Sequence, residues 1–134
     1  MPIIGYWISQ AKCVPMDREN VREAVKVINE GVKNIQDGHS MAIFSEGTRS
    51  KDGKLSEFKK GSMKLATKAK AIIIPVAMDG AYRAFEIDRK FKSIDITVTF
   101  GKPIYTENLT REEEKALSDK VRNVIAEALG QETK

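Results

Sequence analysis

Residues 41–50 read Met-Ala-Ile-Phe-Ser-Glu-Gly-Thr-Arg-Ser. Four apolar residues are followed by a serine and then by an acid, a glycine, a hydroxyl and an arginine. An apolar run that ends so abruptly predicts a buried strand leading into a polar loop. Arginine makes bidentate, charge-assisted hydrogen bonds to phosphate oxygens, and Gly47 keeps the backbone free of side-chain bulk. The stretch therefore favours a loop suited to a phosphate-bearing ligand.

Length and composition indicate one soluble globular domain over residues 1–134. The hydrophobic content is 41% and the charged content is 31%, which are ordinary values for such a domain. A single cysteine, Cys13, excludes an internal disulfide and fits a reducing, cytoplasmic compartment. No apolar stretch approaches the roughly 18–20 residues that a membrane span requires. We therefore expect no disulfide scaffold and no membrane-spanning segment.

Positive charge is concentrated directly after the polar loop. The formal net charge of the chain is +4, whereas residues 49–70 hold eight basic and two acidic residues, a local charge of +6. Such a segment can be a solvated helix and loop face. Its position after the loop favours an anion-attracting surface, with phosphate head groups, an acidic carrier protein, an anionic membrane surface or nucleic acid as candidate partners.

Three segments carry helical signals. Asp17 is a candidate N-cap for a helix with apolar residues at helical spacing, and this helix ends at Gly38. Residues 61–70 predict a short helix. Thr110–Glu113 form a capping box that opens a last helix, which Gly130 ends.

Two further segments predict strands. Residues 71–78 are a continuous apolar run, typical of a strand covered on both faces, and residues 94–100 alternate apolar and polar side chains. Helices between the strands favour parallel pairing with right-handed crossovers. We therefore predict an α/β fold with a mostly parallel sheet flanked by helices, and ligands at the carboxyl ends of its strands.

These residues resemble the glycerolipid acyltransferase family of the PlsC type, which includes 1-acylglycerol-3-phosphate acyltransferases. Val14–Arg18 resembles the family's second block, and Phe44–Ser50 the third, with Ser45 where the family usually has proline. Ile74–Ala77 resembles the fourth block, and Phe58–Gly61 the usual link before it. The similarity covers nearly the whole chain. It implies an acyltransferase of phospholipid biosynthesis.

The resemblance also implies roles for single residues. Arg18 and Arg49 would hold the acceptor phosphate, Glu46 and Gly47 would shape the acceptor site near the glycerol hydroxyls, and Pro75 would line the acyl-donor side. The resemblance implies no cofactor or metal. The acyl donor would be acyl-coenzyme A or acyl-carrier protein. The implied substrate-binding set is Arg18, Glu46, Gly47, Thr48, Arg49, Lys60 and Pro75.

Each role has a structural alternative. Arg18 can be a solvated residue at a helix start, Glu46 and Arg49 can form a salt bridge within the loop, and Pro75 can simply shape a strand. Two other functions also stay open for the chain as a whole. It can be a non-catalytic phospholipid- or phosphate-binding module, or a small basic nucleic-acid-binding protein, although only Phe58 interrupts the lysines and no nucleic-acid motif is present.

The catalytic residues of the family are not matched. Its first block is His-x4-Asp, in which the histidine is the general base and the aspartate orients it. The only histidine is His39, and the residue five positions on is Phe44. We therefore expect a partial acyltransferase domain that binds the acceptor, has no catalytic residue and is inactive alone. Its partners would be a lysophosphatidate-type acceptor, an acyl thioester and the inner face of the membrane, with self-association through an exposed sheet edge.

Overall fold

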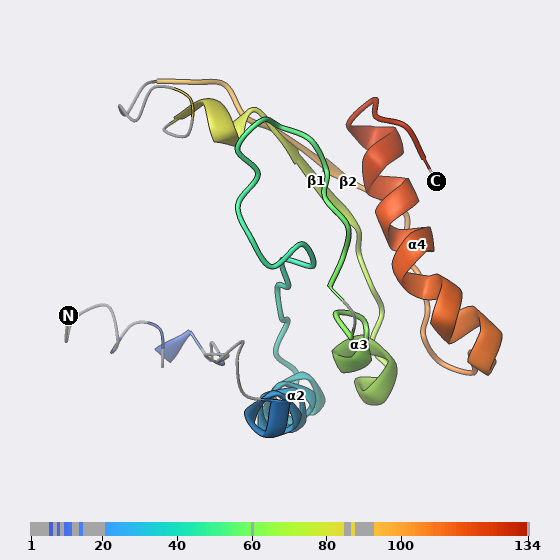
Figure 1. Ribbon diagram of the computed structural model, residues 1–134. Coiled ribbons are helices and arrows are strands. Elements are labelled where there is room, and N and C mark those ends of the chain that lie inside the picture. Colours follow the sequence, from blue (N-terminus) through green and yellow to red (C-terminus); the bar gives the residue numbers. More distant parts are fainter. Residues whose placement is uncertain are drawn as a thin grey trace.

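The computed structural model shows a two-stranded hairpin packed against a long C-terminal helix, with a pair of helices beside it (Figure 1). The elements are α2 (Val21–Gln36), α3 (Lys64–Ala69), β1 (Val76–Asp79), η1 (Ala81–Ala84), β2 (Thr97–Phe100) and α4 (Arg111–Ala128). The structure describes residues 21–59, 61–84 and 93–133, together with residues 6, 8, 10, 11, 14 and 87.

The sheet is antiparallel, so the prediction of a mostly parallel sheet is wrong. β1 pairs with β2 in a register that places Val76 opposite Phe100 and Asp79 opposite Thr97. An isolated bridge between Ile73 and Ile104 extends the pairing beyond the strands. The physical reason lies in the connection. Parallel strands need a crossover, usually a helix. The described part of this connection holds only the short turn of 3₁₀ helix η1.

Residues 41–44 lie outside the sheet, which corrects the prediction of a buried strand there. Their backbone has no strand assignment, and Phe44 is 82% exposed. Within the described residues the sheet consists of β1 and β2 alone. An apolar run indicates which residues favour burial, but a strand forms only where a second strand lies beside it to exchange backbone hydrogen bonds.

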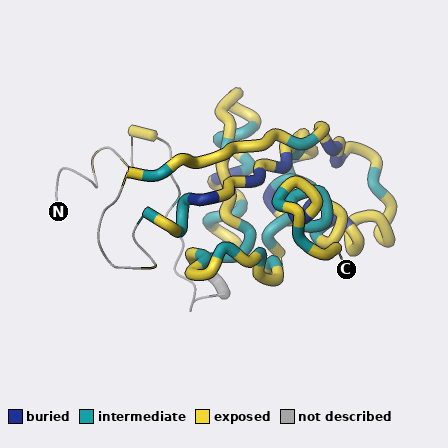
Figure 2. Tube along the Cα trace, turned by 90° about the horizontal axis from the view of Figure 1, so that it is seen from above, coloured by how far each residue is buried: buried dark blue, intermediate teal, exposed yellow. Residues whose placement is uncertain are grey.

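The core lies between α4 and one face of the hairpin (Figure 2). Ile104, Leu117 and Val121 are its buried centre. Gly101 lets helix and sheet approach closely, because a Cβ built there would stand 2.9 Å from a methyl of Val124. Partly buried residues complete this core: Phe58, Met63, Ile73, Leu109 and Ile125.

The other face of the hairpin is exposed, contrary to the prediction that the strand at residues 71–78 is covered on both faces. Side chains alternate across a strand, so the burial of Ala77 directs Val76 and Met78 outward. All four residues of β2 are exposed, and Phe100 keeps 70% of its surface accessible. Large exposed apolar side chains on this hairpin and its flanking segments are Ile72, Ile74, Val76, Met78, Ile96, Val98, Phe100 and Tyr105.

The helix ends confirm the capping signals in the sequence. Thr110 and Glu113 form the complete capping box at the start of α4. The hydrogen bonds from Thr110 lower the pKa of the Glu113 carboxyl, so the stabilisation they provide is lost as the pH falls through that pKa. Gly38 ends α2 with a positive φ of 89°, and Gly130 ends α4 in the same manner with a φ of 66°. The predicted cap at Asp17 lies outside the described residues.

The pair formed by α2 and α3 depends on one glycine. A Cβ built on Gly31 would stand 2.8 Å from a methyl of the buried Leu65, so only glycine admits this approach. The ammonium of Lys68 adds a hydrogen bond of 2.6 Å to the side-chain oxygen of Asn29. Helix α3 is thereby fixed on α2, and the predicted short helix at residues 61–70 is confirmed over Lys64–Ala69.

The packing predicts a large cost for truncating the centre of the core. Leu117→Ala removes a side chain that is only 2% exposed, and we expect a loss of about 3 kcal/mol in the free energy of unfolding. Val25→Ala, at a helical residue 53% exposed, should change it by less than about 0.5 kcal/mol. Urea unfolding followed by circular dichroism measures both. Equal losses in the two variants would contradict this assignment of the core.

Candidate functional site

The polar loop predicted from the sequence is closed at its base. The amide of Gly47 donates to the carbonyl of Phe44 at 2.9 Å, which makes residues 44–47 a turn, and the φ of Gly47 is 66°. The amide of Lys59 donates to the carbonyl of Ser45 at 2.8 Å, which joins the two ends of the loop. Residues 45–59 therefore form a compact loop with adjoining ends, as in an Ω-loop. We call this segment the acceptor loop.

Glu46 spans the acceptor loop. Its carboxylate oxygen Oε2 accepts a hydrogen bond of 2.8 Å from the backbone amide of Ser56. Gly47 lies against the side chain of Lys59, because a Cβ built on the glycine would stand 3.2 Å from Cγ of that lysine. The structure thus places Glu46 beside Ser56 and Gly47 beside Lys59, at the base of the loop. The Glu46 carboxylate therefore has a structural partner within the loop, the backbone amide of Ser56.

Thr48 and Arg49 follow on the exposed side of the loop. The hydroxyl of Ser50 accepts from the amide of Gly53 at 3.0 Å and donates to the carbonyl of Lys54 at 3.2 Å. These bonds shape the tip of the loop, and Arg49, which precedes the tip, is an exposed residue. A guanidinium is a group that binds anionic ligands in bidentate geometry.

The tip of the loop also lies against the 3₁₀ turn after β1. Gly53 has a positive φ of 79°, and a Cβ built on it would stand 2.6 Å from the ring of Tyr82. No side chain fits between this backbone and the ring. The Nε of Arg83 in turn donates to the hydroxyl of Tyr82 at 3.3 Å. The loop is therefore in contact with the hairpin as well as with its own base.

Helix α4 and the residues after it hold the far side of the loop. Arg122 donates from Nε to the carbonyl of Ser56 at 3.3 Å and from Nη2 to the carbonyl of Leu55 at 3.2 Å. Gln131 accepts from the amide of Leu55 and donates to the carbonyl of Gly53, both at 2.8 Å. Sequence reasoning missed both residues. Arg122 occupies a helix position beside the apolar stripe, where an arginine gives no local signal of a contact 67 residues away.

The remaining predicted site residues are placed differently. Pro75 is buried, its carbonyl accepts from the amide of Gly101 at 2.8 Å, and its ring lies against that glycine. This agrees with a strand-shaping role, because proline suits the start of a strand. The role of Pro75 on the acyl-donor side stays a prediction. Arg18 and Lys60 lie outside the described residues.

His39 lies in the turn that ends α2. Its amide donates to the carbonyl of Asn34 at 3.0 Å, and that of Gly38 donates to the carbonyl of Ile35, which together form a Schellman motif. The imidazole is exposed. This agrees with the interpretation of His39 as a polar residue in the turn after a helix.

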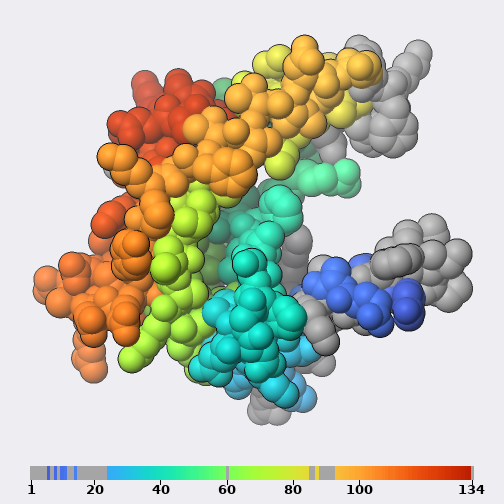
Figure 3. All heavy atoms as spheres, turned by 180° about the vertical axis from the view of Figure 1, so that it is seen from behind, coloured from blue at the N-terminus to red at the C-terminus, as the bar shows by residue number. Residues whose placement is uncertain are grey.

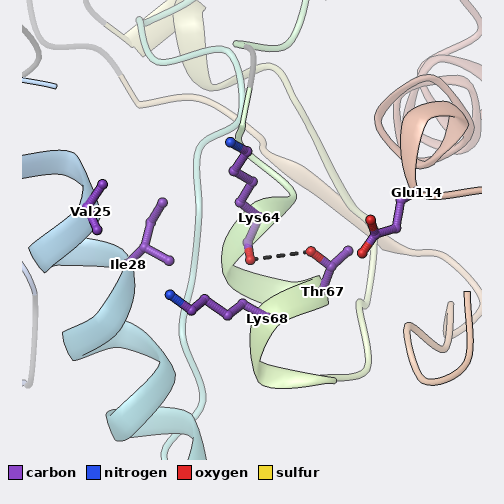
Figure 4. Close-up of a pocket in the computed structure, with 6 residues that line it drawn as sticks. All are labelled: Val25, Ile28, Lys64, Thr67, Lys68 and Glu114. Carbon is purple, nitrogen blue, oxygen red and sulfur yellow. Dashed lines mark hydrogen bonds between the residues drawn. The ribbon is translucent and has the colours of Figure 1, made fainter. Parts of the chain in front are cut away.

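A separate hollow of about 420 Å³ lies between α2 and α3 (Figure 4). Val25 and Ile28 form one wall, and Lys64 and Lys68 extend from α3 on the other. The hollow contains none of the predicted site residues. The lining of this hollow therefore lies outside the acceptor loop. Among the described residues, no group of three or more His, Cys, Asp and Glu side chains could hold a metal ion.

The comparisons with known proteins agree on one family. A family model described as Acyltransferase matches residues 1–79. The chain is 32% identical over 131 residues to the chloroplastic 1-acyl-sn-glycerol-3-phosphate acyltransferase BAT2 of Brassica napus, which covers 96% of this chain and 37% of that protein. It is 34% identical over 124 residues to the human 1-acyl-sn-glycerol-3-phosphate acyltransferase alpha, covering 90% of this chain and 42% of that protein.

A solved structure has the same fold. The crystal structure of the 1-acyl-sn-glycerophosphate (LPA) acyltransferase PlsC from Thermotoga maritima superimposes with a TM-score of 0.72 at 29% identity. It covers 81% of this chain and 44% of that one. Fold and acceptor loop together define a glycerolipid acyltransferase domain. The chain belongs to the acyltransferase family, in its PlsC-type branch, and spans less than half the length of these relatives.

Proposed function

We propose that the chain supplies the acceptor-binding part of a 1-acylglycerol-3-phosphate acyltransferase, an enzyme of phospholipid biosynthesis. In this reaction the free glycerol hydroxyl of lysophosphatidate attacks the carbonyl carbon of an acyl thioester. The new ester bond forms as the carbon–sulfur bond breaks, and a base takes the hydroxyl proton and returns it to the leaving thiolate. The observation that carries the proposal is the ordered acceptor loop, in a chain whose relatives are named as this enzyme.

The acceptor loop divides the work between its two charged side chains. Arg49, exposed on the turn, binds the phosphate through paired N–H donors. Glu46 and Gly47 lie at the base of the loop and form the wall beside the glycerol, with Thr48 between them and the arginine. Arg18 and Lys60 complete the phosphate-binding set, and Pro75 belongs to the donor side. The donor is acyl-coenzyme A or acyl-carrier protein, and no metal or other cofactor takes part.

The basic segment brings the loop to its substrate. The local charge of +6 over residues 49–70 attracts anionic lipid head groups, so the chain works at the cytoplasmic surface of a membrane. No described helix is both long and apolar enough to cross a bilayer. Attraction of this kind is screened by salt, in contrast to the short-range hydrogen bonds of Arg49.

Removal of the guanidinium should weaken acceptor binding. We expect Arg49→Ala to reduce the affinity for lysophosphatidate about tenfold to hundredfold, because hydrogen bonds to a charged group contribute about 1.5–3 kcal/mol. Lys51→Ala removes the same charge two residues further on and should have a much smaller effect. Isothermal titration calorimetry below the micellar concentration measures both. Equal losses would show that only the overall charge matters, against a specific phosphate site at Arg49.

Binding should occur without turnover in the polypeptide of 134 residues. Its one histidine, His39, lies in the turn after α2 and has no aspartate at the family's spacing, so we expect no base that takes the hydroxyl proton. The measurement is thiol release from acyl-coenzyme A in the presence of lysophosphatidate. Steady release above the rate without protein would refute this prediction.

The exposed face of the hairpin supports self-association. A two-stranded sheet is marginal alone, and each described strand has the other as its one partner. Eight large apolar side chains on and beside the hairpin are exposed. A second copy of the chain offers the same apolar face and the same open strand edge, so the two can pair around a two-fold axis.

Charges placed on this face should separate the copies. We expect the wild-type chain to sediment as a dimer at high concentration, and the double variant Val98→Lys with Phe100→Lys to sediment as a monomer. Val25→Lys places a charge at an exposed apolar residue of α2 and should leave the dimer intact. Sedimentation velocity distinguishes these states, and a wild-type chain that stays monomeric across the whole concentration range would contradict the proposal.

A further inference from the structure

One peptide group of the acceptor loop is held by a charged side chain at each end. The carbonyl of Leu55 accepts from Nη2 of Arg122 at 3.2 Å. The amide of Ser56 donates to Oε2 of Glu46 at 2.8 Å. Since this carbonyl and this amide belong to the same peptide bond, a guanidinium and a carboxylate are connected through a single amide plane.

The geometry of the amide makes this connection stiff. A peptide group is planar, and in the trans form its oxygen and its hydrogen point in opposite directions. Arg122 and Glu46 therefore face the Leu55–Ser56 peptide from opposite sides. The positive group at the oxygen and the negative group at the hydrogen polarise the amide in the same sense. Each hydrogen bond consequently strengthens the other, and the direction of the Glu46 carboxylate depends on the position of α4.

Arg122 and Gln131 also hold the backbone on either side of this peptide to the C-terminal part of the chain. The Nε of Arg122 donates to the carbonyl of Ser56 at 3.3 Å. The side chain of Gln131 bonds to Gly53 and Leu55 as a neighbouring strand would, accepting from one amide and donating to one carbonyl. Gln131 is placed by the Schellman motif that Gly130 makes possible, in which its amide donates to the carbonyl of Ala126 at 2.9 Å.

Arg122 has a feature that stability alone does not favour. Its Nη1 atom is buried and has no hydrogen-bond partner among the described residues. A buried donor without a partner costs free energy, and more so on a charged group. The hydrogen bonds that its other two nitrogens donate to the acceptor loop offset this cost.

We propose that Arg122 is a positioning residue for the acceptor site and acts on Glu46 through the Leu55–Ser56 peptide. This inference rests on the proposed function, because it takes Glu46 to form the wall beside the acceptor. In this arrangement α4 sets the direction of a carboxylate that it does not touch. The acceptor loop binds lysophosphatidate tightly only while the guanidinium is in place.

The first experiment uses the free protein and needs no substrate. Hydrogen exchange followed by NMR reports the protection of the Ser56 amide. We expect Arg122→Gln to accelerate its exchange about tenfold or more, because the amide loses a charge-assisted network. Arg111→Gln removes an exposed charge from the first turn of the same helix and should leave this exchange unchanged. Unchanged exchange of the Ser56 amide in Arg122→Gln would overturn the connection.

The second experiment tests coupling between the two charged side chains. Affinities for lysophosphatidate are measured for Glu46→Gln, Arg122→Gln and the double variant. If Arg122 acts through Glu46, each single variant loses about tenfold and the double variant loses little more than either. A purely structural role for Arg122 would give losses that multiply, which would overturn the proposal. If Arg122→Gln does not fold, Arg122→Lys keeps the charge and one donor, and should show a partial loss with the same coupling.

The two experiments separate the inference from the function beneath it. A wild-type chain that does not bind lysophosphatidate refutes the proposed function, whereas the exchange of the Ser56 amide still decides whether Arg122 controls the Glu46 contact. Normal binding with losses that multiply refutes the inference and leaves the proposed function intact.

Discussion

The packing of α4 across the hairpin is the constraint on which the other features depend. Leu117 and Val121 of the helix meet Ile104 from the segment after β2, and this small cluster is the centre of the core. Gly101 allows the close approach, since any side chain there would collide with Val124. Once α4 is fixed in this way, its polar side faces the acceptor loop, and the hairpin and the loop are held by the same helix.

The acceptor loop is ordered by its neighbours rather than by a sheet. In a parallel α/β fold, a loop of this kind would take its position from the strand before it. Here residues 41–44 form no strand, and the loop instead takes its position from Arg122, Gln131 and the ring of Tyr82. Backbone atoms of the loop are the main partners in these contacts. The arrangement therefore fixes the shape of the loop, in which Thr48 and Arg49 are exposed residues.

The basic residues and the exposed apolar residues belong to different segments of the chain. The basic residues that follow the acceptor loop belong to residues 49–70, whereas the exposed apolar side chains belong to the hairpin and its flanks. Figure 3 shows the segment around β2, in orange, at the surface of the molecule, in the upper part of the view. In our proposal the basic segment attracts anionic lipid at a membrane surface, and the exposed apolar side chains pair with those of a second copy.

The sequence by itself determined the local structure and the family. Capping boxes and C-terminal glycines act through hydrogen bonds within a few residues, so Thr110, Gly38 and Gly130 predicted the helix ends correctly. The motif at residues 44–50 identified the PlsC-type family, because its residues are consecutive and can be recognised without the fold. Tertiary structure decided the rest. Strand direction follows from the path of the connection, and the contacts of Arg122 with the acceptor loop bridge 66 and 67 residues of sequence, a distance over which no local pattern specifies which side chain meets which backbone.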